Sequence, residues 1–146
     1  MSSIPLYIVA IDGSEASLRA EKKAIELAKV TGATVRLSHI IQWTAYAPVG
    51  VEGVLMRPVE KDEEERHARE EILEKAKARV ESAGVSVETF YTWGHPAHVL
   101  KGQAEEQKAD MIIVGRKGRS NLAEMIMGSV SNGIAHLATV PVLLVP

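Results

Sequence analysis

A run of glycines, cations and serines near the end of the chain, "VGRKGRSNLAEMIMGSV" (114–130), has the residue types that hold an anion. The segment Gly115–Gly118 encloses two cations, and a second segment, Gly128–Ser131, follows after nine further residues. Glycine permits positive φ and close approach of a ligand, so backbone N–H groups here can form an anion cradle. A helix that opens at Gly128 adds free N–H groups and two serine hydroxyls. The spacing Gly-x2-Gly-x9-Gly-[Ser/Thr] therefore predicts a phosphate site, against the alternative that Gly115 merely ends a strand and Gly128 merely begins a helix.

Other phosphate-handling motifs are excluded at the turn after the first apolar run, which reads "DGSEAS" (12–17). It matches neither Gly-x4-Gly-Lys-[Ser/Thr] nor Gly-x-Gly-x-x-Gly. An aspartyl-phosphate phosphatase needs a second aspartate two positions after Asp12, where Ser14 stands. A response regulator needs an acceptor aspartate where this chain has "YTWG" (91–94). Asp12 is therefore not interpreted as a nucleophile; it either accepts a hydrogen bond from a ribose hydroxyl or adenine amine, or caps the following helix.

Three histidines raise the question of a metal or a catalytic base. His95 and His98 are spaced i, i+3, but no carboxylate is evidently placed to complete a metal site. His39 is interpreted as a strand-end residue that flanks the pocket rather than as a base. We therefore expect no metal held by protein side chains.

Composition limits the class of protein. The chain has 146 residues, of which 46% are hydrophobic and 25% charged, so it fits one domain, 1–146, that buries about two thirds of its unfolded surface. A net charge of −2 and 4% aromatic residues do not suit a general nucleic-acid binder. Without cysteine there is neither a disulfide framework nor a thiolate zinc site. We find no signal peptide and no apolar run long enough to span a membrane, and expect a soluble cytoplasmic protein.

Apolar periodicity indicates five strands that alternate with four helices. The third strand alternates apolar and polar residues, as is typical of a sheet edge, whereas the first and the fourth are continuous apolar runs. In the charged second helix the buried stripe is thin (Ala68, Ile72, Ala76, Val80 and Ala83), and "EKDEEERHARE" (60–70) is interpreted as a solvated face. The predicted strands are 6–11, 34–41, 85–92, 111–115 and 142–145. The first predicted helix begins after the N-cap Ser14 and ends near Thr31. The other three run from about Val59 to Ala83, from Pro96 to about Lys108, and from about Val130 to Ala138.

This order predicts a doubly wound parallel α/β sheet in a single domain. Its two most apolar strands, the first and the fourth, should be central and adjacent. Ligands bind such sheets beyond the carboxyl ends of the strands, where the strand order reverses. Asp12 and Gly115 follow these two strands, so the glycine-rich segment is predicted to lie at the ligand site.

The assembled features resemble the universal stress protein family, specifically its ATP-binding branch, over essentially the whole chain. Three segments show the resemblance: "VAIDGSEAS" (9–17), "GHPAHVL" (94–100) and "GRKGRSNLAEMIMGSVSNGIAHLATVPVLLV" (115–145). The last segment is the specific one, because the family's nucleotide-binding pattern is the same Gly-x2-Gly-x9-Gly-[Ser/Thr]. The resemblance implies a Rossmann-like sheet of order 3-2-1-4-5, a homodimer and a regulatory role in stress.

By position, the resemblance also implies the ligand contacts. Ala10, Asp12 and Ile40 would line the adenosine pocket. Mg²⁺ would accompany ATP and be held mainly by the phosphates. The residues that would wrap the phosphates are Gly115, Arg116, Lys117, Gly118, Gly128, Ser129, Val130 and Ser131.

Two classes of function stay open at this point. The favoured one is a nucleotide-dependent regulator, whose ATP occupancy changes a surface that another protein reads. The alternative is an enzyme, a slow ATPase or nucleotidyl transferase that uses the same pocket. No residue is evidently aimed at an attacking water, although Glu124 lies in the nine-residue spacer, so at most weak hydrolysis is expected. The sequence does not determine the partner protein or the inducing stress. It also does not determine whether the loop 42–58, which contains Trp43, Tyr46 and Met56, is ordered.

The last strand predicts how two copies would associate. "PVLLVP" (141–146) is apolar and should lie at a sheet edge, and an exposed apolar edge pairs readily with a copy of itself. Pro141 and Pro146 bracket it and limit the pairing. We therefore expect a homodimer through Val142–Val145, against the alternative that loops of the same chain cover this edge.

Overall fold

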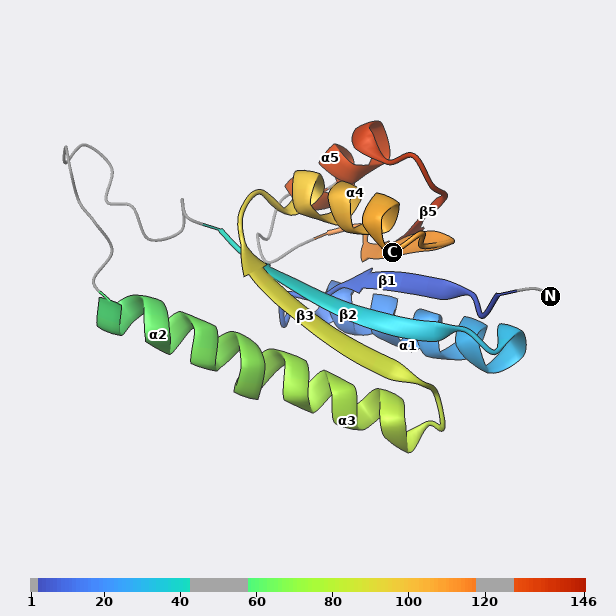
Figure 1. The fold of residues 1–146 in the computed structure, drawn as a ribbon, viewed down its shortest axis with the longest axis horizontal. Coiled ribbons are helices and arrows are strands. Elements are labelled where there is room, and N and C mark those ends of the chain that lie inside the picture. Colours follow the sequence, from blue (N-terminus) through green and yellow to red (C-terminus); the bar gives the residue numbers. More distant parts are fainter. Residues whose placement is uncertain (1–2, 43–57, 118–127) are drawn as a thin grey trace.

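The computed structural model describes residues 3–42, 58–117 and 128–146, and shows strands alternating with helices along the chain (Figure 1). The nine-residue spacer of the glycine motif and the loop after the second strand lie outside these residues. Gly118, Glu124, Trp43, Tyr46 and Met56 therefore also lie outside the described residues. The elements in chain order are β1 (Leu6–Ala10), α1 (Glu15–Thr31), β2 (Thr34–Ile41), α2 (Pro58–Arg66), the π-helical segment η2 (His67–Leu73), α3 (Glu74–Ser82), β3 (Val87–Trp93), α4 (Pro96–Glu106), β4 (Met111–Gly115), α5 (Ser129–Leu137) and β5 (Val142–Val145).

All five strands form one parallel sheet of order β3-β2-β1-β4-β5. This confirms the predicted fold, with β1 and β4 adjacent at the centre. Ile8, Val9, Ile112 and Ile113 are fully buried on these two strands, as expected of continuous apolar runs covered on both faces. The partly exposed β3 lies at one edge.

Helices cover both faces of the sheet (Figure 1). On one face, α1 and the α2–η2–α3 helix enclose a core that includes Ala24, Leu37 and Val80. On the other face, α4 and α5 enclose a second core around Leu100 and Ile134. No helix in the described ranges is long and apolar enough to cross a bilayer.

The helix boundaries follow local signals in the sequence. Ser14 is the N-cap of α1, where its side chain accepts a hydrogen bond from the Ser17 N–H. Gly32 ends the same helix with φ of 75° and donates its N–H to the Ala28 carbonyl, as expected of a left-handed C-cap. Pro96 is the first residue of α4, where its missing N–H costs nothing.

The second helical region differs from the prediction in two respects. It contains a π-helical segment, in which the Glu74 N–H donates to the carbonyl of Arg69, five residues earlier. Its buried stripe includes Leu73, which the α-helical pattern had missed, whereas the predicted Ala83 is only half-buried at the helix end. The following strand begins at Val87 rather than at residue 85, because Gly84 first reverses the chain with φ of 80°.

An ion pair between a buried carboxylate and a half-exposed guanidinium connects the two helices on this face. Glu21 of α1 has only 2% of its side chain exposed, and both of its carboxylate oxygens accept hydrogen bonds from the Arg79 guanidinium of α3, at 2.6 and 2.9 Å. The hydrogen bonds to Glu21 raise the pKa of Arg79, despite the opposing effect of burial. The pair therefore fixes α3 against α1.

Candidate functional site

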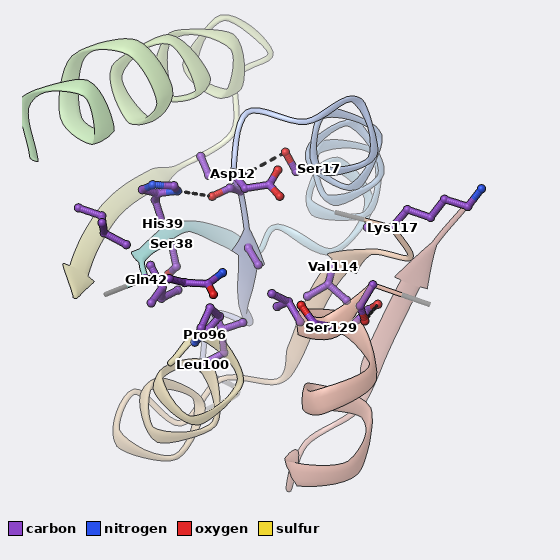
Figure 2. Close-up of a pocket in the computed structure, with 18 of the residues that line it drawn as sticks. Asp12, Ser17, Ser38, His39, Gln42, Pro96, Leu100, Val114, Lys117 and Ser129 are labelled. Carbon is purple, nitrogen blue, oxygen red and sulfur yellow. Dashed lines mark hydrogen bonds between the residues drawn. The ribbon is translucent and has the colours of Figure 1, made fainter. Parts of the chain in front are cut away.

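A cavity of about 370 Å³ opens at the carboxyl ends of β1, β2 and β4, the place predicted from the strand order (Figure 2). The starts of α4 and α5 and a part of α2–η2 complete its walls. The residues that line it are Ala10, Ile11, Asp12, Ser17, Ser38, His39, Ile40, Ile41, Gln42, Glu64, His67, Pro96, Leu100, Val114, Gly115, Lys117, Gly128, Ser129, Val130 and Ser131. Its volume is in the range of small-molecule and cofactor sites.

The two ends of the glycine-rich motif are joined through the backbone of Arg116. Its carbonyl accepts hydrogen bonds from the Gly128 N–H and from the Ser131 hydroxyl, both at 2.8 Å. Its N–H donates to the Val145 carbonyl on the neighbouring strand at 2.7 Å. The start of α5 is thereby fixed beside the end of β4, although nine residues separate Gly118 from Gly128.

Ser131 has a different part in this arrangement from the one predicted. A hydroxyl has one hydrogen to donate, and that of Ser131 is directed at the carbonyls of Arg116 (2.8 Å) and Gly128 (3.0 Å). Ser131 lines the cavity, but in this geometry its hydroxyl closes the motif and is not directed at a ligand.

The open start of α5 supplies the anion-binding groups. Gly128 is its N-cap and makes no side-chain capping bond, so the N–H groups of Ser129, Val130 and Ser131 have no partners within the helix. Lys117 lines the same cavity, whereas the exposed Arg116 side chain does not. Figure 2 shows Ser129 and Lys117 on the same side of the cavity, with the Lys117 side chain extending away from it. A positive helix end favours a phosphate, and Lys117 adds positive charge on this side of the cavity.

Gly115 is required for a different reason from the one predicted. Its φ is not positive, so conformational freedom does not explain the glycine. A Cβ placed there would lie 2.7 Å from the backbone carbon and oxygen of Ala16 and 2.8 Å from its Cβ. The glycine allows β4 to end against the first turn of α1, which brings the ends of β1 and β4 together at the cavity.

We expect Gly115→Ala to destabilise the fold by about 1–3 kcal/mol, because a rigid backbone must move to admit the added methyl. The control is Gly102→Ala in α4, an exposed site with open space around the added Cβ. That change should stabilise by about 0.5–1 kcal/mol, since alanine is the better helix former. Urea denaturation of both variants checks this, and an equal effect at the two positions would contradict the packing role of Gly115.

Asp12 shapes the turn after β1. Its Oδ1 accepts a hydrogen bond from the Ser14 N–H at 2.8 Å, and its own N–H donates to the Ser17 hydroxyl at 3.3 Å. The N-cap of α1 is Ser14, as predicted, so the alternative in which Asp12 caps this helix is replaced by a role of Asp12 in the preceding turn. Asp12 also lines the cavity, where Figure 2 shows it near His39 and Ser17.

Of the three histidines considered above, only His39 lines the cavity. His39 is buried, and its Nδ1 donates to the Ile11 carbonyl at 2.7 Å, because a carbonyl can only accept. It flanks the cavity, as predicted. The rings of His95 and His98 are 4.8 Å apart, and no group of three His, Asp or Glu side chains in the described ranges is placed to hold a metal ion.

Several residues of the cavity wall were missed by sequence reasoning. Glu64 and His67 lie in the charged run that was interpreted as a solvated face, yet both line the cavity. Ser38 is fully buried beside it and donates to Gln103 of α4, whose amide oxygen also accepts from Arg36. A signal existed for Ser38, a polar residue inside an apolar strand, but none distinguished Glu64 from the glutamates around it.

The chain is similar to known proteins over almost its whole length. The family model described as "Universal stress protein family" matches residues 8–146. The universal stress protein YxiE of Bacillus subtilis is 37% identical over 142 residues, which cover 94% of this chain and 96% of that protein. The structure of the universal stress protein UspA from Lactobacillus plantarum matches with a TM-score of 0.82 at 20% identity, covering all of both chains. A universal stress protein in complex with cAMP matches with a TM-score of 0.72 at 26% identity, covering 99% of each chain.

Proposed function

The chain belongs to the universal stress protein family, and we propose that it binds ATP with Mg²⁺ and acts in the cytoplasm as a nucleotide-dependent regulator of the stress response. The observation that supports the ligand best is the open start of α5, in a cavity of nucleotide size that Lys117 also lines. The similar universal stress protein bound to cAMP supports an adenine nucleotide.

The parts of the nucleotide are assigned by the character of the cavity walls. The triphosphate lies against Gly115–Lys117 and the N–H groups of Ser129–Ser131, and Gly118 completes this part of the motif. The nucleoside lies between Ala10 and Ile40, with Asp12 accepting a hydrogen bond from a ribose hydroxyl. Within the described ranges no side-chain cluster is placed to hold a metal, so the phosphates supply most ligands of Mg²⁺.

A regulatory role agrees with the groups at the phosphate end. In the part of the chain that the structure describes, this end has Lys117 and serine hydroxyls, and the Ser131 hydroxyl is occupied by two carbonyls. These groups bind and neutralise phosphate, whereas hydrolysis also needs a side chain that positions water. We therefore propose that bound ATP acts mainly as a signal.

Calorimetry with MgATP and adenosine tests the ligand assignment. ATP should bind at least roughly tenfold more tightly than adenosine, because a hydrogen bond to a charged group contributes about 1.5–3 kcal/mol. Lys117→Ala should weaken ATP binding by a similar factor and leave adenosine binding unchanged. The matched control is Arg116→Ala, which removes a neighbouring cation whose side chain is not in the cavity wall. Equal affinities of the wild type for ATP and adenosine would contradict the phosphate assignment.

We further propose a homodimer through β5. This strand lies at an edge of the sheet, and its residues Val142, Leu143 and Leu144 are only half-buried. Pairing with a copy of itself would cover this edge.

Leu143→Lys is expected to convert the dimer to a monomer at micromolar concentration, because two lysines would face each other across the edge. Light scattering measures the mass, and circular dichroism checks that the monomer is folded. Thr89→Lys places the same charge on the exposed opposite edge, β3, and should leave the dimer intact. A Leu143→Lys protein that remains dimeric would show that the interface lies elsewhere.

A further inference from the structure

We propose that Glu64 recognises the exocyclic amine of the base, at the end of the cavity opposite the phosphates; this inference rests on the nucleotide binding proposed above. Two polar residues of the α2–η2 helix line the cavity, Glu64 and His67. Glu64 is half-buried, whereas His67 is exposed. Glu64 is therefore the better shielded of the two from competing water.

The position of the phosphate site determines which part of a nucleotide reaches Glu64. Lys117 and the start of α5 lie on one side of the cavity, and the helix α2–η2 lies beyond Asp12 and His39 on the other (Figure 2). The apolar residues of the wall include Ile40 and Leu100. Phosphate and base are the two ends of a nucleotide, so a triphosphate at α5 directs the base toward α2.

The π-helical segment directs Glu64 toward the cavity. Ala76 of α3 faces the core, and Glu64 precedes it by twelve residues. In a regular α-helix of 3.6 residues per turn, this separation would turn Glu64 away from the direction of Ala76 by about 120°. A π-helix has more residues per turn than an α-helix, so the π-helical segment between the two residues reduces this angle. Such segments are frequent at functional sites. The buried Ala68 and Ile72 then lie on the inner side of the helix, and Glu64 reaches the cavity.

A neighbouring hydrogen bond holds this part of the helix in place. The indole N–H of Trp93 donates to the Glu65 carboxylate at 2.9 Å. Trp93 is the last residue of β3, so the bond ties the helix to the end of the sheet where the cavity lies. The helix that carries Glu64 is thus held in place before any ligand binds, so little helix ordering remains to oppose recognition.

The chemistry of Glu64 determines what it can recognise. An ionised carboxylate only accepts hydrogen bonds, so it pairs with a donor on the base. The 6-amino group of adenine is such a donor, whereas a base with hydrogen at this position offers none. A charged acceptor left without its donor should reduce affinity roughly tenfold to hundredfold.

A binding cycle tests the assignment. Calorimetry compares ATP with purine riboside triphosphate, which lacks only the 6-amino group, and with 2′-deoxy-ATP. The proteins are the wild type, Glu64→Ala, and the matched control Glu63→Ala, which removes an exposed carboxylate next to it in the same helix. We expect the wild type and Glu63→Ala to prefer ATP over the desamino analogue by tenfold or more. In Glu64→Ala this preference should fall to about twofold or less, the size expected without a direct hydrogen bond.

The outcomes distinguish this inference from the proposed function. A wild type that binds neither triphosphate overturns nucleotide binding, and the inference with it. If Glu64→Ala binds ATP and retains the full preference for the amine, only the inference is overturned. The inference is also overturned if Glu64→Ala instead loses the discrimination between ATP and 2′-deoxy-ATP, since Glu64 would then contact the ribose.

Discussion

Gly128→Val is expected to lower the affinity for MgATP by at least about a hundredfold, because it removes two or more hydrogen bonds of about 1.5–3 kcal/mol each. Gly128 is buried at the N-cap of α5, with φ of −62° and ψ of 157°. Valine adopts this extended backbone conformation readily, so the substitution is not expected to strain the turn. Its branched side chain would instead project where the phosphates approach the N–H groups of Ser129 and Val130.

The affinity for adenosine shows whether Gly128→Val affects only the contacts of the protein with the phosphates. The nucleoside does not reach the start of α5, so its affinity for Gly128→Val should stay within about twofold of the wild-type value, a change of less than 0.5 kcal/mol. Gly102→Val, at an exposed helical position remote from the cavity, should leave both affinities unchanged. Wild-type affinity of Gly128→Val for ATP would show that the phosphates lie elsewhere.

Most of the fold could be predicted because its strands are short apolar or alternating segments that lie between helical patterns. The segments 34–41, 111–115 and 142–145 were predicted with the bounds that the structure has. The helix boundaries at Ser14 and Pro96 followed equally from local capping chemistry. Each of these signals depends on neighbours in the sequence, which is why no knowledge of the tertiary structure was needed.

The site was predicted less completely, because its details depend on contacts between distant residues. Gly115 was identified correctly as part of the cavity, but the reason for the glycine is the backbone of Ala16, which only the folded chain brings near. Ser131 similarly meets the Arg116 carbonyl across the motif. Glu64 was missed because periodicity assumes a regular α-helix, and the π-helical segment changes which side chains face inward.

Arg79→Leu is expected to destabilise the protein by about 3 kcal/mol, measured by urea denaturation at neutral pH, because it leaves the Glu21 carboxylate buried without its partner. This value is at the lower end of the range for a broken buried pair. A cavity of about 220 Å³ beside Glu21 and Arg79 gives water a route to the carboxylate once the guanidinium is gone.

Two further variants separate the buried charge from a general loss of packing. Glu21→Leu in the Arg79→Leu background should recover most of the lost stability, since apolar residues often replace a buried ion pair at little cost. Lys75→Leu breaks the exposed pair with Glu71 and should cost no more than about 1 kcal/mol. If the double variant is as unstable as Arg79→Leu, the loss comes from packing of the Arg79 stem. The helix α2, which contains Glu64, is continuous with α3 through η2. A weakened attachment of α3 to α1 should therefore also reduce the preference of the protein for ATP over the analogue without the 6-amino group.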